Sequence, residues 1–201
     1  MQRDGCDDDF DAPNGERRPI NMLADHVAVA IENARMFERA TNDPLTGLPN
    51  SSYFLLELAK VMRSSRVGSE GGLILLDIDS FKRVNTVGGA EVGDQALIDI
   101  SSTLQEVLRA DGLVARYGSD KFAVLLPPDP ALSIHVRLRD VAERARASVA
   151  AKTYHGVSLS ACLGGLSFSS DTVESAPDLV AIADDALARA RHRGESEVEI
   201  I

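Results

Sequence analysis

The sequence Leu113-Val-Ala-Arg-Tyr-Gly-Ser-Asp-Lys-Phe-Ala-Val-Leu-Leu126 decides the fold of this chain. It contains two apolar runs, residues 113–117 and 122–126, joined by Gly118-Ser119-Asp120-Lys121. A short link with glycine and aspartate between two apolar runs is typical of a β-hairpin. We therefore predict two paired strands with Asp120 at the tip of their turn.

A second apolar run, Gly72-Leu-Ile-Leu-Leu-Asp-Ile-Asp79, precedes the hairpin and is typical of a buried central strand. We expect further strands at 157–168 and 197–201, and helices at 51–63, 91–110, 134–150 and 177–192. This order predicts an α/β (α+β) domain with one mixed sheet. The chain has no Gly-x-Gly-x-x-Gly and no Walker-type Gly-Lys-Ser/Thr motif, which disfavours a doubly wound dinucleotide fold.

The composition excludes several classes of protein. The chain has 201 residues with 31 acidic and 21 basic side chains, a net charge of -10, and this length suits one domain with an appendage. Its apolar runs are too short to cross a bilayer, and no secretory segment follows Met1. With only Cys6 and Cys162, we expect a reducing cytoplasm. The acidic balance argues against nucleic-acid binding, but it allows one anionic nucleotide held by a metal.

The N-terminal part divides into two segments. Residues 1–18 are polar and acidic, and we expect them to be disordered. Residues 19–42 are expected to form a helix that leads into a domain at 43–201. Apolar residues recur in this helix with the alternating spacing of a short coiled coil: Leu23, Val27, Ala30, Ala34 and Phe37. A parallel helix pair and an amphipathic helix packed on its own domain both fit this pattern.

Carboxylates stand where the predicted strands end. Asp77 and Asp79 close the central run, and Asp120 lies in the hairpin turn. Carboxylates from two strands suit Mg²⁺, which completes its shell with water and phosphate oxygens, and a pair of such ions promotes attack on phosphorus. Acids at such positions are also commonly solvated caps and turn formers, so both interpretations stay open at this point.

Five separated motifs together resemble the GGDEF domain of bacterial diguanylate cyclases. They are Asp43-Pro-Leu-Thr-Gly-Leu-Pro-Asn50, Leu76-Asp-Ile-Asp-Ser-Phe-Lys-Arg-Val-Asn85, Gly93-Asp94, Ala115-Arg-Tyr-Gly-Ser-Asp-Lys-Phe122 and Ala183-Asp-Asp-Ala-Leu-Ala-Arg-Ala-Arg-His-Arg-Gly194. The resemblance implies a five-stranded mixed sheet wrapped by helices, as in nucleotidyl cyclases and the polymerase palm. It implies synthesis of cyclic di-GMP from two GTP, each held by one of two facing domains. The preceding helix resembles the last helix of a GAF sensor domain.

Residue by residue, the resemblance implies a metal site for Mg²⁺ or Mn²⁺. Its ligands would be the carboxylate of Asp77, the main-chain carbonyl of Ile78 and the carboxylate of Asp120. Asp120 would also be the candidate base for the ribose 3′-hydroxyl. Lys82 would neutralise the triphosphate as a compact ammonium.

The resemblance also implies the nucleotide contacts. Asn85 and Asp94 match the pair that reads the guanine edge, while Phe81 and Gly118 belong to the substrate-binding segments. Arg191 stands where the family usually has a second phosphate-binding lysine. Without the resemblance, side chains such as these would be interpreted as solvated surface or loop residues.

The signature departs from the family pattern at two positions. It reads Gly118-Ser119-Asp120-Lys121-Phe122 instead of Gly-Gly-Asp/Glu-Glu-Phe. Ser119 adds a side chain where glycine lets the backbone approach the nucleotide. Lys121 reverses the charge of an acid that supports metal binding and catalysis in the family. Lys121 could instead point away from the site or contact a phosphate.

The product-inhibition motif is altered too. The family has Arg-x-x-Asp before its signature, whereas this chain has Arg109-Ala110-Asp111-Gly112, with Asp111 one residue early. Ala90 also replaces a usual histidine, and Glu195-Ser196 replaces a usual Arg-Asn. These changes predict a degenerate domain.

Three hypotheses follow from the sequence. The first is a degenerate, inactive or strongly impaired GGDEF domain that binds GTP or cyclic di-GMP and acts as a regulatory or dimerising module. The second is a diguanylate cyclase that tolerates a variant signature. The third is a fold that serves protein contacts without nucleotide. In the first two, a homodimer through the N-terminal helix would set how two domains face one another.

Overall fold

The computed structural model describes residues 14–64, 69–109, 111–169 and 175–201. The chain divides into two units, Met1–Ala40 and Thr41–Ile201. The first unit contains helix α1 (Asn14–Thr41), which begins at Asn14 rather than at Pro19 because Glu16, Arg17 and Arg18 are good helix formers. Residues 1–13 of the expected tail lie outside the described residues. Within the described ranges, no helix is both long and apolar enough to cross a bilayer.

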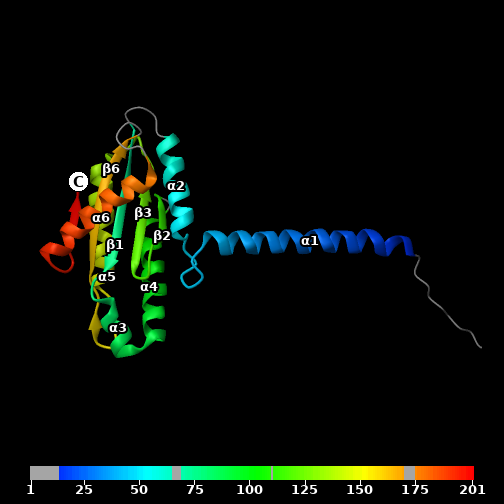
Figure 1. The fold of residues 1–201 in the computed structure, drawn as a ribbon, viewed down its shortest axis with the longest axis horizontal. Helices are drawn as coiled ribbons and strands as arrows, with labels where there is room; N and C mark the ends of the chain where they lie inside the picture. Colours follow the sequence, from blue (N-terminus) through cyan, green and yellow to red (C-terminus); the bar gives the residue numbers. More distant parts are fainter. Residues whose placement is uncertain (1–13, 65–68, 110, 170–174) are drawn as a thin grey trace, which may run out of the picture. The chain divides into compact units, whose positions relative to one another are not determined.

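The second unit is built on the predicted five-stranded sheet, whose order is β2-β3-β1-β6-β7 (Figure 1). Its strands are β1 (Glu70–Ile78), β2 (Leu113–Arg116), β3 (Lys121–Leu126), β6 (Ala161–Ser169) and β7 (Val198–Ile200). The pairs are antiparallel except β6 with β7, which is parallel. The mixed sheet and the central place of β1 are therefore confirmed.

Helices cover both faces of the sheet (Figure 1). They are α2 (Ser51–Ser64), α3 (Phe81–Gly88), α4 (Ala90–Leu108), α5 (Ile134–Ala150) and α6 (Ala176–Arg193). Alternate side chains of β1 point to opposite faces. Ile74 and Leu76 pack in a core with α3, α4 and α5, and Leu73 and Leu75 pack in a core with α2 and α6.

Two parts of the sequence prediction were wrong. Residues 157–168 do not form one strand, because β4 (Thr153–Tyr154) and β5 (Val157–Ser158) make a separate small hairpin before β6 begins. Its turn contains His155 and Gly156 with positive φ angles, 46° and 81°. Helix α3 was missed because it buries only Phe81 and Val84, too few apolar positions to show a helical period.

Helix α6 lies unusually close to the sheet at Gly164 of β6. A Cβ placed on Gly164 would lie 2.0 Å from the backbone nitrogen of Leu187 and 2.7 Å from the carbonyl oxygen of Ala183. Because glycine has no side chain, the backbone of α6 can contact the strand directly at this position. This contact brings the last turns of α6 beside the ends of β1 and β3.

Candidate functional site

The end of β1 places one buried carboxylate in the centre of the sheet. Asp77 is paired in register with Lys121 of β3 and Cys162 of β6, and its side chain is only 7% exposed. Arg191 of α6 donates a hydrogen bond from Nη1 to Asp77 Oδ2 at 2.6 Å. Burial raises the pKa of the Asp77 carboxyl above its ordinary value, and the charge of Arg191 opposes this rise without cancelling it.

The hairpin turn is attached directly to the end of β1. The main-chain N–H of Ile78 donates to the carbonyl oxygen of Asp120 at 3.2 Å. The carboxylate of Asp120 accepts a hydrogen bond from the Ser119 hydroxyl at 2.7 Å, and its negative charge contributes to the raised pKa of Asp77. The structure therefore brings Asp120, in the turn before β3, next to Asp77 and Ile78 at the end of β1, as expected for a hairpin tip beside a neighbouring strand.

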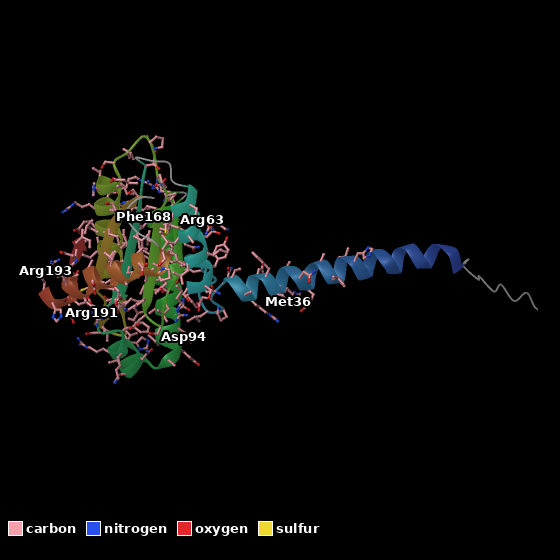
Figure 2. The ribbon with its side chains drawn as sticks, turned by 45° about the horizontal axis from the view of Figure 1, so that its top comes forward. Met36, Arg63, Asp94, Phe168, Arg191 and Arg193 are labelled. Atoms are coloured by element: carbon pink, nitrogen blue, oxygen red, sulfur yellow. The ribbon has the colours of Figure 1, made fainter. Side chains whose placement is uncertain are left out.

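Lys121 points toward α6. Its Nζ lies 2.9 Å from Oδ1 of Asp184, and the two side chains are 32% and 55% exposed. Both residues line a cavity of about 330 Å³ whose wall also includes Arg191 and His192. Figure 2 shows Arg191 and Arg193 on the end of α6, which forms this wall. The sequence left open whether Lys121 points away from the site or contacts a phosphate; in the structure its ammonium pairs with Asp184, a partner that the sequence did not indicate.

The residues expected to read guanine come from α3 and α4. The Oδ1 atom of Asn85 lies 1.8 Å from the place where a Cβ on Gly93 would be, so only glycine at this position allows Asn85 to lie so close to α4. Asp94, the next residue, is exposed on α4 (Figure 2), and Lys82 is exposed on α3. Phe81, which was expected in a substrate-binding segment, is buried in the core at the start of α3.

The second carboxylate of Asp77-Ile78-Asp79 has a structural role. Asp79 Oδ2 accepts hydrogen bonds from the hydroxyl of Ser160 at 2.7 Å and from the N–H of Ser196 at 2.9 Å. Beside it, the hydroxyl of Ser80 donates to the carboxylate of Glu195 at 3.1 Å. The loop after α6 thus brings a negative charge to the segment that precedes Lys82.

The segment of the expected inhibitory site is held by backbone contacts. Arg109 and Asp111 are both exposed, and the carbonyl oxygen of Asp111 accepts a hydrogen bond from Arg137 at 3.0 Å. A Cβ on Gly112 would lie 2.2 Å from the carbonyl oxygen of Leu125. An aspartate at position 112 therefore does not fit this backbone, and Asp111 is tied in place by Arg137.

Sequence reasoning missed two residues that organise the site. Arg116 bonds through its two terminal nitrogens to the Asp43 carboxylate at 2.9 Å and to the carbonyl oxygen of Ser119 at 2.8 Å. Asp184 is the partner of Lys121. Asp184 belongs to the fifth motif, and its spacing of seven residues from Arg191 puts both on one face of α6, but neither signal named Lys121 as its partner.

The site contains oxygen donors of the kind that Mg²⁺ prefers. The carboxylate of Asp77 feels the negative charge of Asp120, and the main chains of Ile78 and Asp120 are joined by a hydrogen bond. A hard octahedral ion takes a few such protein oxygens together with water and phosphate. Within the described ranges, no group of three or more His, Cys, Asp or Glu side chains is arranged to hold a metal ion. Asp77 and Asp120 would therefore hold an ion only together with further ligands, such as water or the oxygens of a phosphate.

Comparisons with known proteins agree with this geometry. Residues 40–197 match the family model described as "Diguanylate cyclase, GGDEF domain". The chain is 38% identical over 167 residues to diguanylate cyclase DgcP of Pseudomonas aeruginosa, covering 81% of this chain and 24% of that protein. It is 32% identical over 193 residues to diguanylate cyclase A of Treponema denticola, covering 92% of this chain and 51% of that protein.

A solved structure resembles nearly the whole chain. The coiled coil and GGDEF domain of DgcB from Caulobacter crescentus, in complex with c-di-GMP, superimposes with a TM-score of 0.81 at 25% identity. The match covers 92% of this chain and 98% of that one. The chain spans only a quarter to a half of the curated relatives described above. On its motifs, its sheet and these matches, the chain belongs to the GGDEF domain family of diguanylate cyclases.

Proposed function

We propose that this chain is a GGDEF domain of cyclic di-GMP signalling that holds GTP with Mg²⁺ or Mn²⁺ but is inactive or strongly impaired as a cyclase. In this role it acts as a regulatory or dimerising module. The observation that carries the proposal is the position of Lys121, a cation, directly across from Asp77 on the neighbouring strand.

The charge at position 121 accounts for the expected loss of activity. At about 4 Å and an effective dielectric constant of 20, one unit of charge repulsion costs about 4 kcal/mol. Each 1.36 kcal/mol corresponds to about a tenfold change in rate. The ion pair with Asp184 reduces the repulsion between Lys121 and a metal. However, a lysine at position 121 cannot provide the carboxylate that the family usually has there.

The retained residues support nucleotide binding. Asp77, Ile78 and Asp120 would hold the metal, which supplies charge neutralisation for the triphosphate when bound. Asn85 and Asp94 would bind the guanine edge. Lys82 and Arg191 would bind phosphate oxygens.

An active diguanylate cyclase, which would condense two GTP to cyclic di-GMP, is the second candidate. It is favoured by the ion pair between Lys121 and Asp184, since a side-chain carboxylate of the protein then offsets part of the ammonium charge beside Asp77 and Asp120. In this case Asp120 would take the proton of the ribose 3′-hydroxyl.

Turnover with GTP decides between the candidates. The protein is incubated with GTP and Mg²⁺ or Mn²⁺, and cyclic di-GMP is measured by chromatography beside the Asp120→Ala variant. We expect little or no product from the wild type, together with metal-dependent binding of GTP in calorimetry. Changing Ser119→Gly with Lys121→Glu should then raise the product yield.

The other outcomes contradict the proposal in different ways. Rapid product formation that Asp120→Ala abolishes would establish the active cyclase. If GTP does not bind in the presence of either metal, the chain would be a protein-contact module without nucleotide.

We further propose that α1 pairs with its counterpart in a homodimer and that the whole chain acts in the cytoplasm. Two of the residues with coiled-coil spacing, Val27 and Phe37, are 49% and 63% exposed. Such residues are buried when helices pair. A GAF origin for α1 remains part of this proposal.

Removal of residues 1–40 tests the dimer. The remaining unit contains the complete sheet and both cores. We expect the truncated protein to be monomeric at concentrations where the full chain is dimeric, as measured by sedimentation velocity. An unchanged proportion of dimer would show that other surfaces hold the two copies together.

A further inference from the structure

The carboxylate of Asp77 is bound to the protein's own cation. Its side chain is 7% exposed, and a buried carboxylate needs a partner to remain charged. Arg191 is the hydrogen-bond partner that the structure shows, with 2.6 Å between Nη1 and Oδ2. The expected first metal ligand is therefore occupied by a guanidinium.

The two members of this pair differ in freedom. Asp77 belongs to the central strand and is flanked by β3 and β6, so its carboxylate cannot move far. Arg191 lies in the last turns of α6, is 55% exposed and borders the cavity that it shares with Lys121. Only the arginine can leave the pair by rotating its side chain into solvent.

We propose that Arg191 is a replaceable counter-ion of Asp77, which holds the carboxylate in the metal-free protein and moves to a phosphate group when a divalent cation binds with a nucleoside triphosphate. This inference rests on the nucleotide site proposed above. A cation without nucleotide must break the ion pair and leaves Arg191 without an anion. A cation that arrives with a triphosphate provides Arg191 with a new partner.

Metal and nucleotide binding are therefore coupled. Each ligand increases the affinity for the other by the same factor, since coupling between two binding events is reciprocal. Because Asp77 is paired with Arg191, the domain binds the free ion weakly and the ion bound to a triphosphate tightly. The domain then responds to the metal–nucleotide complex instead of to the metal.

Binding of Mn²⁺ without nucleotide tests this exchange. The full chain is titrated with Mn²⁺, and the free ion is measured by electron paramagnetic resonance. We expect Arg191→Gln to bind Mn²⁺ about tenfold more tightly than the wild type. Arg191→Lys keeps the charge and should stay within about twofold of the wild type.

The matched control is Arg193→Gln. Arg193 lies on the same turn and carries the same charge, but it pairs with Glu199 at 2.6 Å and not with Asp77. Its replacement should leave the Mn²⁺ affinity unchanged. In parallel, Mn²⁺ should raise the melting temperature of Arg191→Gln more than that of the wild type, which also verifies that this variant folds.

Three outcomes separate the claims. If Arg191→Gln binds Mn²⁺ no more tightly than the wild type, or if Arg193→Gln gains equally, the counter-ion role is overturned. If Arg191→Gln gains affinity for Mn²⁺ and loses affinity for a non-hydrolysable GTP analogue, the whole exchange is supported. If it gains affinity for Mn²⁺ while no variant binds the analogue, the counter-ion role stands and the proposed nucleotide function fails.

Discussion

Replacement of Gly164 by alanine is expected to lower the free energy of unfolding by about 3 kcal/mol or more. The new Cβ would lie 2.0 Å from the backbone nitrogen of Leu187 and 2.4 Å from its Cα. These are backbone atoms inside a helix, so no side-chain rotation relieves the overlap. Either α6 or β6 must move.

The movement should also disturb the site. Arg191 and Asp184 are carried by α6, and their partners Asp77 and Lys121 are carried by the sheet. Displacement of α6 lengthens both ion pairs at once. We therefore expect Gly164→Ala to weaken metal-dependent GTP binding as well as stability.

Urea unfolding monitored by circular dichroism measures the first effect, with Gly72→Ala as the matched control. Gly72 is also a buried strand glycine, but a Cβ there meets side-chain atoms of Leu138 and Ile134, which can adjust. Its replacement should cost less than half as much as Gly164→Ala. Equal effects of the two substitutions would mean that α6 does not lie against Gly164 in solution.

Replacement of Arg116 by alanine is expected to cost about 2 to 3 kcal/mol. Loss of one partner from a fully buried ion pair costs about 3 to 5 kcal/mol. Here the side chains of Arg116 and Asp43 are 14% and 19% exposed, so we expect a smaller effect. The same change frees the carbonyl oxygen of Ser119, next to Asp120, and should loosen the hairpin turn.

The pH dependence gives this prediction a second measurement. Burial tends to raise the pKa of the Asp43 carboxyl, but hydrogen bonds from Thr46 and Arg116 outweigh burial and lower the pKa below its ordinary value of 3.8. A carboxyl with a lowered pKa stabilises the fold above the ordinary pKa, and this stabilisation is lost as the pH falls through the folded-state pKa. The difference in stability between the wild type and Arg116→Ala should therefore narrow below about pH 3.8.

An exposed ion pair provides the control for Arg116. Lys60 and Glu57 are 2.7 Å apart on α2, with side chains 52% and 25% exposed. Lys60→Ala should leave the free energy of unfolding almost unchanged, because solvent screens such pairs. If Arg116→Ala has an equally small effect, the bonds of Arg116 to Asp43 and to the Ser119 carbonyl contribute nothing to stability.

Most of the fold follows from local patterns in the sequence. The continuous apolar run of β1 and the Gly-Asp turn between β2 and β3 were predicted because each pattern reports burial or turn geometry directly. Helix α5 was predicted with the bounds that it has in the structure. Helix α3 and the small hairpin were missed because elements with so few buried residues leave no period to detect.

The expected roles of the site residues came from the five motifs, and the structure brings Asp77, Ile78 and Asp120 together as those motifs implied. The motifs could not give the ionic partners of the charged residues. Nothing near position 121 indicates that Lys121 pairs with Asp184, and nothing near position 77 indicates Arg191.

The sequence by itself determined the hairpin, the buried central strand β1, the positions of the carboxylates at strand ends, and the family, whereas the strand order came from the structure. Only the tertiary structure decided which charge neutralises which, because Arg191 and Asp77 are 114 residues apart and Arg116 and Asp43 are 73 apart. Periodicity reports the face of an element that is buried, since neighbours three or four residues away share that face. The partner of a charge depends on which element packs against it. For Asp77 that element is α6, and the glycine at position 164 sets how closely α6 approaches the sheet.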